Sequence, residues 1–323
     1  MASPRIRLHG SQLQQRFAMA SIISRPPTAV SPSAASSPSA ASTSASASTM
    51  PTSVGSKQGE DPGTVRFTNM QDLFNVMDRT TRDSLTVTNV SLDNFTKIEC
   101  TREKKGRKFR FRDYGSDSRI LIITIPTGLH EQLHKLLYDG YTRQVHHRSW
   151  INIGSTTLPS QQGHSGRGSK EGDSTGGPRP ERAAKGAWPT LVIEAGVSQT
   201  LAQLRIIDMR RWFSMSNHEV KIVLLAKFDG TTILLEKWEE EIPVRPGATT
   251  TRHSLQHQEP VLRQTITITR DTTTDPISYH VTSGALVLSF RLLFLRDPGP
   301  REGDLAFGVQ ELEEYAEDVW AQV

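Results

Sequence analysis

The stretch Trp188-Pro189-Thr190-Leu191-Val192-Ile193-Glu194-Ala195-Gly196 decides the fold class of this chain. A short, nearly continuous apolar run between Trp-Pro and glycine indicates a strand that is buried on both faces. A few residues later, Thr200 and Gln203 have the spacing of a capping box, which predicts that a helix begins there and runs to about Phe213. A buried strand followed directly by a helix favours an α/β domain.

Outward from this stretch, the periodicity of apolar residues predicts a mixed sheet core flanked by helices. Two further strands are joined around Asp229-Gly230, which is typical of a hairpin turn. Helices are predicted over 68–78, 128–139 and 309–321, and strands over 85–90, 95–100, 108–112, 120–125, 150–153, 220–227, 232–238, 263–270 and 286–295.

The positive charge of the chain is concentrated at its N-terminus. The whole chain carries 38 basic and 34 acidic side chains, a net charge of +4. Residues 1–59 lack Asp and Glu but hold five basic residues, so the other 264 residues have a net charge of −1. Residues 31–50 contain nine Ser and six Ala, which cannot bury enough apolar surface to fold. We therefore expect a disordered Ser/Ala-rich tail over 1–62, either a plain leader or an organellar transit peptide.

The remainder, 63–323, is predicted to be a single domain. Residues 155–187 are rich in Gly, Ser, Pro and charge, which predicts a mobile loop at about those positions. A single cysteine, Cys100, excludes an internal disulfide framework and is expected to be a small buried side chain. No run of 18 apolar residues is present, so no membrane segment is expected.

Residues 102–112 include seven Lys or Arg. Basic and aromatic residues alternate strictly over 108–112, which predicts a strand with one basic face. Such a strand could follow a phosphate backbone, or it could be a sheet edge protected by charge.

A literal H-E-x-x-H motif runs from His130 to His134. On a helix, histidines four residues apart share a face and can bind zinc, while Glu131 acts as a general base. The third ligand would come from His146, His147, Glu171 or Asp173, and the protein would then be a zinc peptidase.

Dispersed carboxylates offer a second chemistry. Asp173 and Glu194 are predicted to meet at one sheet edge, where carboxylates hold Mg²⁺ for phosphodiester hydrolysis. Around them, Lys170-Glu171-Gly172-Asp173, a spacer of moderate length and the Trp188–Ser198 segment resemble an uncharacterised fungal family with a restriction-endonuclease-like, PD-(D/E)XK core. Ile125-Pro126-Thr127 also matches this pattern, and the resemblance covers about residues 118–321.

The resemblance implies a role for each matching position. Asp173 and Glu194 would bind the metal, and Glu131 would complete the site. It also implies that the H-E-x-x-H match is a coincidence. The sequence departs from the pattern at Gly196, where the nuclease lysine is expected, and either Arg205 or Lys221 would then supply the cation.

The sequence therefore predicts a Mg²⁺-dependent nuclease with an incomplete active site, acting on DNA or RNA. The alternatives are a catalytically inert interaction module on the same fold and, less favoured, the zinc peptidase. For any protein that acts on nucleic acid, the expected location is intracellular, in the nucleus, the cytoplasm or mitochondria.

Overall fold

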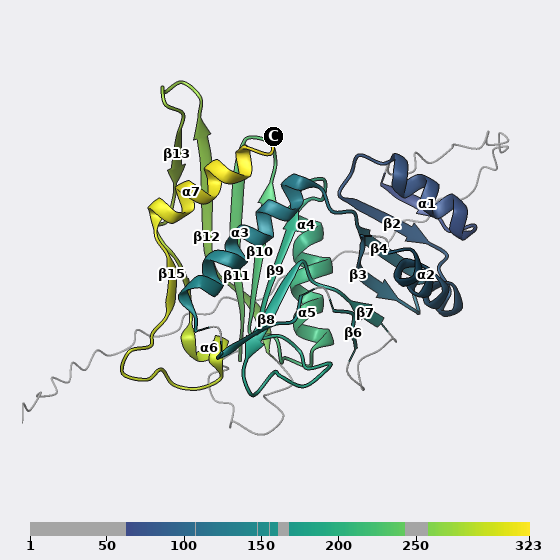
Figure 1. Ribbon diagram of the computed structural model, residues 1–323, viewed down its shortest axis with the longest axis horizontal. Coiled ribbons are helices and arrows are strands. Elements are labelled where there is room, and N and C mark those ends of the chain that lie inside the picture. The colour runs from purple at the N-terminus through teal and green to yellow at the C-terminus, as the bar shows by residue number, and fades with distance from the viewer. Residues whose placement is uncertain (1–62, 107, 147, 155, 161–167, 243–257) are drawn as a thin grey trace, which may run out of the picture. The chain divides into compact units, whose positions relative to one another are not determined.

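The buried strand predicted from the sequence is β9, and it lies inside a large mixed sheet of the computed structural model (Figure 1). The structure describes residues 63–106, 108–146, 148–154, 156–160, 168–242 and 258–323. The predicted N-terminal tail lies outside these residues. Within them, this sheet has the order β13-β12-β11-β10-β9-β8-β5. Its strands are β5 (Trp150–Asn152), β8 (Ser174–Pro178), β9 (Leu191–Gly196), β10 (Ile222–Phe228), β11 (Thr232–Glu241), β12 (Glu259–Asp271) and β13 (Ser278–Val281).

Strands β9 and β10 run parallel, whereas the other neighbours in this sheet are antiparallel. The crossover between them is helical and consists of α4 (Leu201–Gln203), the π-helical segment η1 (Leu204–Met209) and α5 (Arg210–Met215). The predicted Thr200–Gln203 capping box is present at its start. A parallel pair needs such a crossover because the chain must return to the same end of the sheet.

A second sheet of the described residues has the order β1-β2-β4-β3-β7-β6. It consists of β1 (Thr64–Arg66), β2 (Ser84–Thr88), β3 (Arg110–Gly115), β4 (Ile120–Thr124), β6 (Leu158–Pro159) and β7 (Gly168–Lys170). Helices α1 (Met70–Arg79) and α2 (Leu92–Lys105) pack on it through Leu73, Phe74, Phe95 and Ile98. A small pair, β14 (Leu286–Leu288) and β15 (Leu305–Phe307), completes the strands.

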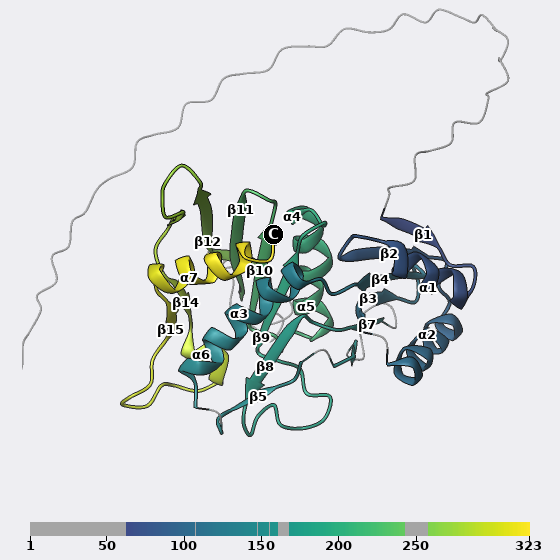
Figure 2. The same cartoon turned by 45° about the horizontal axis from the view of Figure 1, so that its top comes forward.

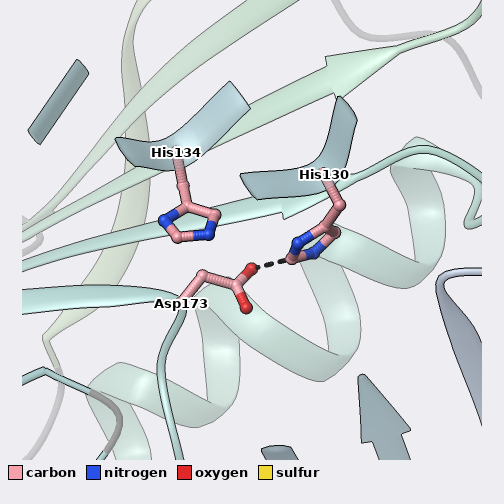
Figure 3. Close-up of side chains that lie close together, drawn as sticks. All are labelled: His130, His134 and Asp173. Atoms are coloured by element: carbon pink, nitrogen blue, oxygen red, sulfur yellow. Dashed lines mark ion pairs between the residues drawn. The ribbon is translucent and has the colours of Figure 1, made fainter. Parts of the chain in front are cut away.

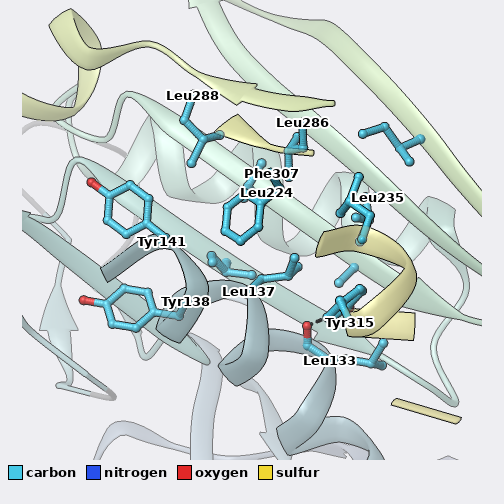
Figure 4. Close-up of a cluster of buried hydrophobic side chains, with 14 of the residues drawn as sticks. Leu133, Leu137, Tyr138, Tyr141, Leu224, Leu235, Leu286, Leu288, Phe307 and Tyr315 are labelled. Carbon is cyan, nitrogen blue, oxygen red and sulfur yellow. Dashed lines mark hydrogen bonds between the residues drawn. The ribbon is translucent and has the colours of Figure 1, made fainter. Parts of the chain in front are cut away.

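Helices cover both faces of the larger sheet (Figures 1 and 2). One face carries α3 (Gly128–Gln144) and α7 (Val309–Trp320), with the short α6 (Phe290–Phe294) nearby, and the other carries η1 and α5. Figure 4 shows part of the first core, in which Leu133 and Leu137 of α3 lie close to Tyr315 of α7. The hydroxyl of Tyr315 donates to the backbone oxygen of Leu133 at 2.9 Å, so the polar tip of this buried ring has a partner. None of the described helices combines the length and the apolar character needed to cross a membrane.

Two predicted strands are helical in the structure. The segment 95–100 lies in α2, where Ser91 caps the N-terminus and Gly106, with φ 59°, ends the helix. These caps and the i, i+3 pair Phe95 and Ile98 outweigh the local alternation. The segment 286–295 divides into the short strand β14 and the short helix α6. Leu295 takes a left-handed conformation and ends this helix. Cys100, expected to be buried, is exposed.

The loop predicted at 155–187 is wrong over its three described strands, whereas residues 179–187 do form turns and irregular chain. The described part of this segment contains β6, β7 and β8, and Lys170, Glu171 and Asp173 are all buried. Ser and Gly indicated a loop, but strand pairing inside two sheets determined the outcome. Residues 155 and 161–167 lie outside the described residues.

The predicted basic strand exists as β3, but it is not a sheet edge, and one of its arginines is buried. It lies between β4 and β7, and the side chain of Arg112 is 1 % exposed. The arginines of this strand therefore serve internal ion pairs. Predicted elements corresponding to α1, β2, β4, α3, β5, β9, β10, β11, β12 and α7 are confirmed.

Asp83, just before β2, joins the second sheet to the end of β9. Its buried carboxylate accepts hydrogen bonds from the backbone N–H groups of Val197 at 2.8 Å and Ser198 at 2.9 Å, and from the hydroxyl of Ser198. Two partly buried backbone donors thus depend on one buried side chain.

We expect Asp83→Ala to lower the free energy of unfolding by about 2–4 kcal/mol, because the two N–H groups lose their acceptor in a buried place. Urea denaturation followed by tryptophan fluorescence measures this change. Asp93→Ala, at an exposed position in the first turn of α2, is the control and should change stability by less than about 1 kcal/mol. Equal losses in the two variants would contradict the role given to Asp83.

Candidate metal centre

The N-terminal turns of α3 present the H-E-x-x-H residues to the interior. Thr127 caps the helix by accepting a hydrogen bond from the backbone N–H of His130. Because the helix begins there, His130 and His134 stand one above the other on one face, and both are buried. Glu131, one position along, is 33 % exposed in its side chain. The helix thus places two imidazoles inside and one carboxylate near the surface.

Asp173 reaches the same place from the segment between β7 and β8. Figure 3 shows its carboxylate pointing toward the two imidazole rings, with a dashed line to His130. Oδ2 of Asp173 lies 3.3 Å from Nε2 of His130 and accepts the backbone N–H of Ala195 at 2.9 Å. In the described residues, His130, His134 and Asp173 each offer a ligand atom, and these atoms lie within 4.8 Å of one another. We call these three residues the His–Asp group.

The two histidines differ in how their nitrogens are satisfied. Nδ1 of His134 lies 2.8 Å from the hydroxyl of Ser174, and its Nε2 lies 3.3 Å from Oε1 of Glu131. The two ring nitrogens of His130 are buried, and neither makes a hydrogen bond, although both lie at ion-pair distance from carboxylates. A fixed imidazole with one nitrogen directed inward, beside another whose nitrogens lack hydrogen bonds, is an arrangement that suits a metal ion.

Arg110 of β3 closes the group on the pocket side. Its guanidinium contacts Oε1 of Glu131 at 2.8 Å and Oδ1 of Asp173 at 3.3 Å. Although burial lowers the pKa of Arg110, the two carboxylates raise it more, so the net change is upward. The site therefore contains one permanent cation placed between two carboxylates.

A pocket of about 530 Å³ opens beside this group. Arg110 and Glu131 line the pocket and also contact members of the His–Asp group. The rest of the wall consists of Arg102, Lys108, Phe109, Pro126 and Glu171. Arg102 is held by both oxygens of Glu171 at 2.8 Å, whereas Lys108 is exposed. The buried group thus has a basic approach from the surface.

Glu194, predicted as a metal ligand, is not a member of the His–Asp group. Its Oε1 accepts from the indole N–H of Trp212 and lies 3.9 Å from Nζ of Lys170. Lys170 in turn lies 2.8 Å from Asp208, which also pairs with Arg112. All four charged side chains are at most 1 % exposed. We call Arg112, Lys170, Glu194 and Asp208 the ionic cluster.

The two predicted replacements for the nuclease lysine lie elsewhere. Arg205 pairs with Glu236 of β11, with Nε 3.0 Å from Oε2. Lys221 donates to the backbone oxygen of His218 at the other end of β10. The cation beside Glu194 is Lys170, which the sequence does not identify as a site residue. The apolar strand β9 that carries Glu194 is predicted from the sequence, whereas the short strand β7 that carries Lys170 is not.

Arg110 was also missed as a site residue. The alternation over 108–112 indicated its strand, but only the pairing of β3 with β7 brings it to Asp173. Of the third-ligand candidates for the two histidines, Asp173 is the one that joins them, while Glu171 is bound by Arg102. His147 lies outside the described residues.

The donor set fits an ion of the zinc type. Two imidazole nitrogens and one carboxylate oxygen suit zinc and other transition ions, whereas Mg²⁺ prefers oxygen ligands throughout. Donors around a tetrahedral zinc ion are about 3.4 Å apart, and the atoms here lie within 4.8 Å of one another, so a pair at that limit would have to approach by about 1.4 Å. The Mg²⁺ site of Asp173, Glu194 and Glu131 stays a prediction.

Comparisons with known protein families, with curated proteins and with solved structures give no match. The resemblance to the PD-(D/E)XK core therefore stays a prediction.

In the metal-free protein, the His130 imidazole is expected to lose its proton at a higher pH than an ordinary histidine does. Burial by itself lowers its pKa, but the carboxylates of Asp173 and Glu131 raise it to about 9. The resulting stability is present below pH 6.5 and is lost as the pH rises through 9. An NMR titration of the ring in the presence of a chelator measures this value, and Asp173→Asn should lower it. A His130 that is already neutral at pH 7 would contradict the ion pair.

In the ionic cluster, we expect two isosteric substitutions to differ in how much they lower the free energy of unfolding. Burial, together with the charges of Asp208 and Asp173, raises the pKa of Glu194 well above its usual range, which favours the protonated carboxyl. Glu194→Gln should then change the free energy of unfolding by less than about 1 kcal/mol, because the amide is uncharged like a protonated carboxyl and its oxygen can also accept from Trp212. Asp208→Asn leaves two buried cations unpaired and should cost about 3–5 kcal/mol. Urea denaturation measures both changes, and a large loss in Glu194→Gln would show that Glu194 is ionised.

Proposed function

We propose that this chain is a divalent-metal-dependent hydrolase of nucleic-acid phosphodiesters, in which His130, His134 and Asp173 hold the ion. The single observation that carries the proposal is that this His–Asp group adjoins a pocket with a basic wall. The proposal keeps the nuclease function that the sequence predicts and replaces its all-carboxylate metal site with a mixed nitrogen and oxygen site.

The basic wall favours a phosphodiester over a peptide as substrate. Lys108 and Arg110 line the pocket and can face an anion, whereas the third basic residue of the wall, Arg102, is held by Glu171. Arginine and lysine are the side chains that bind phosphate oxygens, and a neutral peptide bond would gain little from them. The side chains around the pocket therefore orient an anionic group toward the His–Asp group.

A divalent ion held there would supply positive charge that polarises the phosphate and makes water more acidic. Glu131 lies at the junction of pocket and group. Burial raises its pKa, but hydrogen bonds with His130 and His134 and the charge of Arg110 lower it more, so the net change is downward and the group stays a carboxylate. As a carboxylate it would orient the attacking water by accepting a hydrogen bond from it. The water oxygen would form a bond to phosphorus while the bond from phosphorus to one ester oxygen breaks, and the proton of the water would pass through solvent to that leaving oxygen. Ser174 holds the ring of His134 through its Nδ1, so that Nε2 stays directed inward.

The restriction-endonuclease-like fold is part of the same proposal. It is supported by a mixed sheet flanked by helices and by the order α3, β8, β9, helical crossover and parallel β10. Glu194 stands near the end of β9, as that fold requires of its central carboxylate.

A second candidate is a catalytically inert interaction module on the same fold. The observation that favours it is the pairing of the buried charges. Arg110 already contacts Asp173 and Glu131, and Lys170 and Arg112 already contact Asp208. A closed network of this kind can fix a structure without binding any ion.

The proposal predicts that cleavage of DNA or RNA by the full chain requires a transition ion. With Zn²⁺ or Mn²⁺ present, His134→Ala and Glu131→Gln should each lower the cleavage rate at least about 100-fold, the first through loss of the ion and the second through loss of the carboxylate that orients the water. Gel assays on single- and double-stranded substrates, together with calorimetric titration of each ion, provide the measurement. Glu194→Gln is the matched control and should stay within about threefold of the wild type.

The alternatives give different results in the same assays. Cleavage with Mg²⁺ alone that is abolished by Glu194→Gln would restore the carboxylate site. Zinc-dependent hydrolysis of a protein substrate without nucleic-acid cleavage would indicate the peptidase. A chain that neither binds an ion nor cleaves either substrate would be the inert module.

A further inference from the structure

Arg110 occupies an unusual position for a residue next to a metal centre. Of the described residues that line the pocket, it is the one that contacts both Glu131 and Asp173. Its side chain is 15 % exposed, so it reaches the surface as well as the buried group. The same guanidinium therefore contacts Asp173, one of the proposed ion ligands, and also lines the pocket.

The guanidinium stands where it opposes a metal ion. Oδ2 of Asp173 accepts from the backbone of Ala195, and Oδ1 faces Arg110. An ion that binds Asp173 would place two positive charges within a few ångströms of Arg110. At that distance, like charges repel strongly in a partly buried site. Binding of the ion therefore weakens the hold of Asp173 and Glu131 on Arg110.

The pocket gives the displaced side chain an alternative partner. Arg102 cannot serve an incoming anion freely, because both oxygens of Glu171 hold its guanidinium. Lys108 is exposed on the same wall and is a second available cation. An oxyanion placed between Lys108 and Arg110 would replace the two carboxylates as the negatively charged partner of Arg110.

We propose that Arg110 is a displaceable internal cation that couples ion binding at the His–Asp group to oxyanion binding in the pocket. In the metal-free protein it pairs with both Asp173 and Glu131. When the ion binds, Arg110 turns into the pocket and donates to a tetrahedral oxyanion of the phosphate type. The inference rests on the proposed metal site, and it adds an order of binding, with the ion first and the anion second.

Linkage makes the coupling reciprocal. If the ion increases the affinity for the anion, the anion increases the affinity for the ion by the same factor. The wild-type protein alone therefore tests the idea: sulfate should bind at least about tenfold more tightly with Zn²⁺ present than without it. Sulfate is a suitable probe because it is tetrahedral and leaves zinc in solution.

Arg110→Ala separates the two roles by changing the two affinities in opposite directions. Calorimetric titration of the untagged full chain should show Zn²⁺ bound at least about tenfold more tightly, because a competing cation is gone. Sulfate binding in the presence of Zn²⁺ should fall at least about tenfold. Lys108→Ala is the matched control from the same wall: it should weaken sulfate binding and leave the affinity for Zn²⁺ within about twofold of the wild type.

The results that overturn the inference are distinct from those that overturn the function. If the wild type binds Zn²⁺ but Arg110→Ala leaves that affinity unchanged or weaker, the coupling is wrong and the metal site stands. If the wild type does not bind Zn²⁺, both are wrong. Circular dichroism checks that the variants fold. Arg110→Lys keeps the charge but loses the forked guanidinium, and it should bind Zn²⁺ with an affinity between those of the wild type and Arg110→Ala.

Discussion

The buried carboxylate of Asp173 makes the contacts on which this structure depends. One oxygen accepts the backbone N–H of Ala195 on β9 and lies beside His130 of α3, and the other faces Arg110 of β3. A helix, a strand of each sheet and the pocket wall thus meet at one buried charge. Such a charge is tolerated in the interior only when it is well compensated, because its desolvation is costly. The same three partners that compensate it also create the site.

The alternation of side chains along β9 separates the chemistry into two places. Leu191, Ile193 and Ala195 pack toward α3 and α7, whereas Val192 packs with the crossover helices on the opposite face. Glu194 follows Val192 by two positions and therefore lies near Trp212, inside the ionic cluster. Asp173 and Glu194, which a linear motif places side by side, serve different clusters for this reason. One cluster adjoins a pocket, and the other is enclosed.

Much of the fold was predictable from local patterns. The Leu191–Gly196 strand, the capping box after it and the amphipathic helix that carries His130 and His134 all form where the periodicity indicated. The errors arise where another effect outweighs the local pattern. Capping decides α2 against the alternation of its residues, and strand pairing decides the β6–β8 region against its loop composition. In the site, the two histidines and Asp173 were candidates from the sequence, although the family resemblance implied that the histidine motif is a coincidence, and Arg110 and Lys170 were not candidates.

The sequence by itself determined that a buried strand and a helix bearing two histidines at i and i+4 would exist, because apolar periodicity and helical spacing are local properties. Only the tertiary structure decided that Asp173, about forty residues away, joins those histidines and that Arg110 stands over it. It also decided that Lys170, not Arg205 or Lys221, lies beside Glu194. These choices depend on strand order and register, and distant segments fix those through packing that no short stretch of sequence contains.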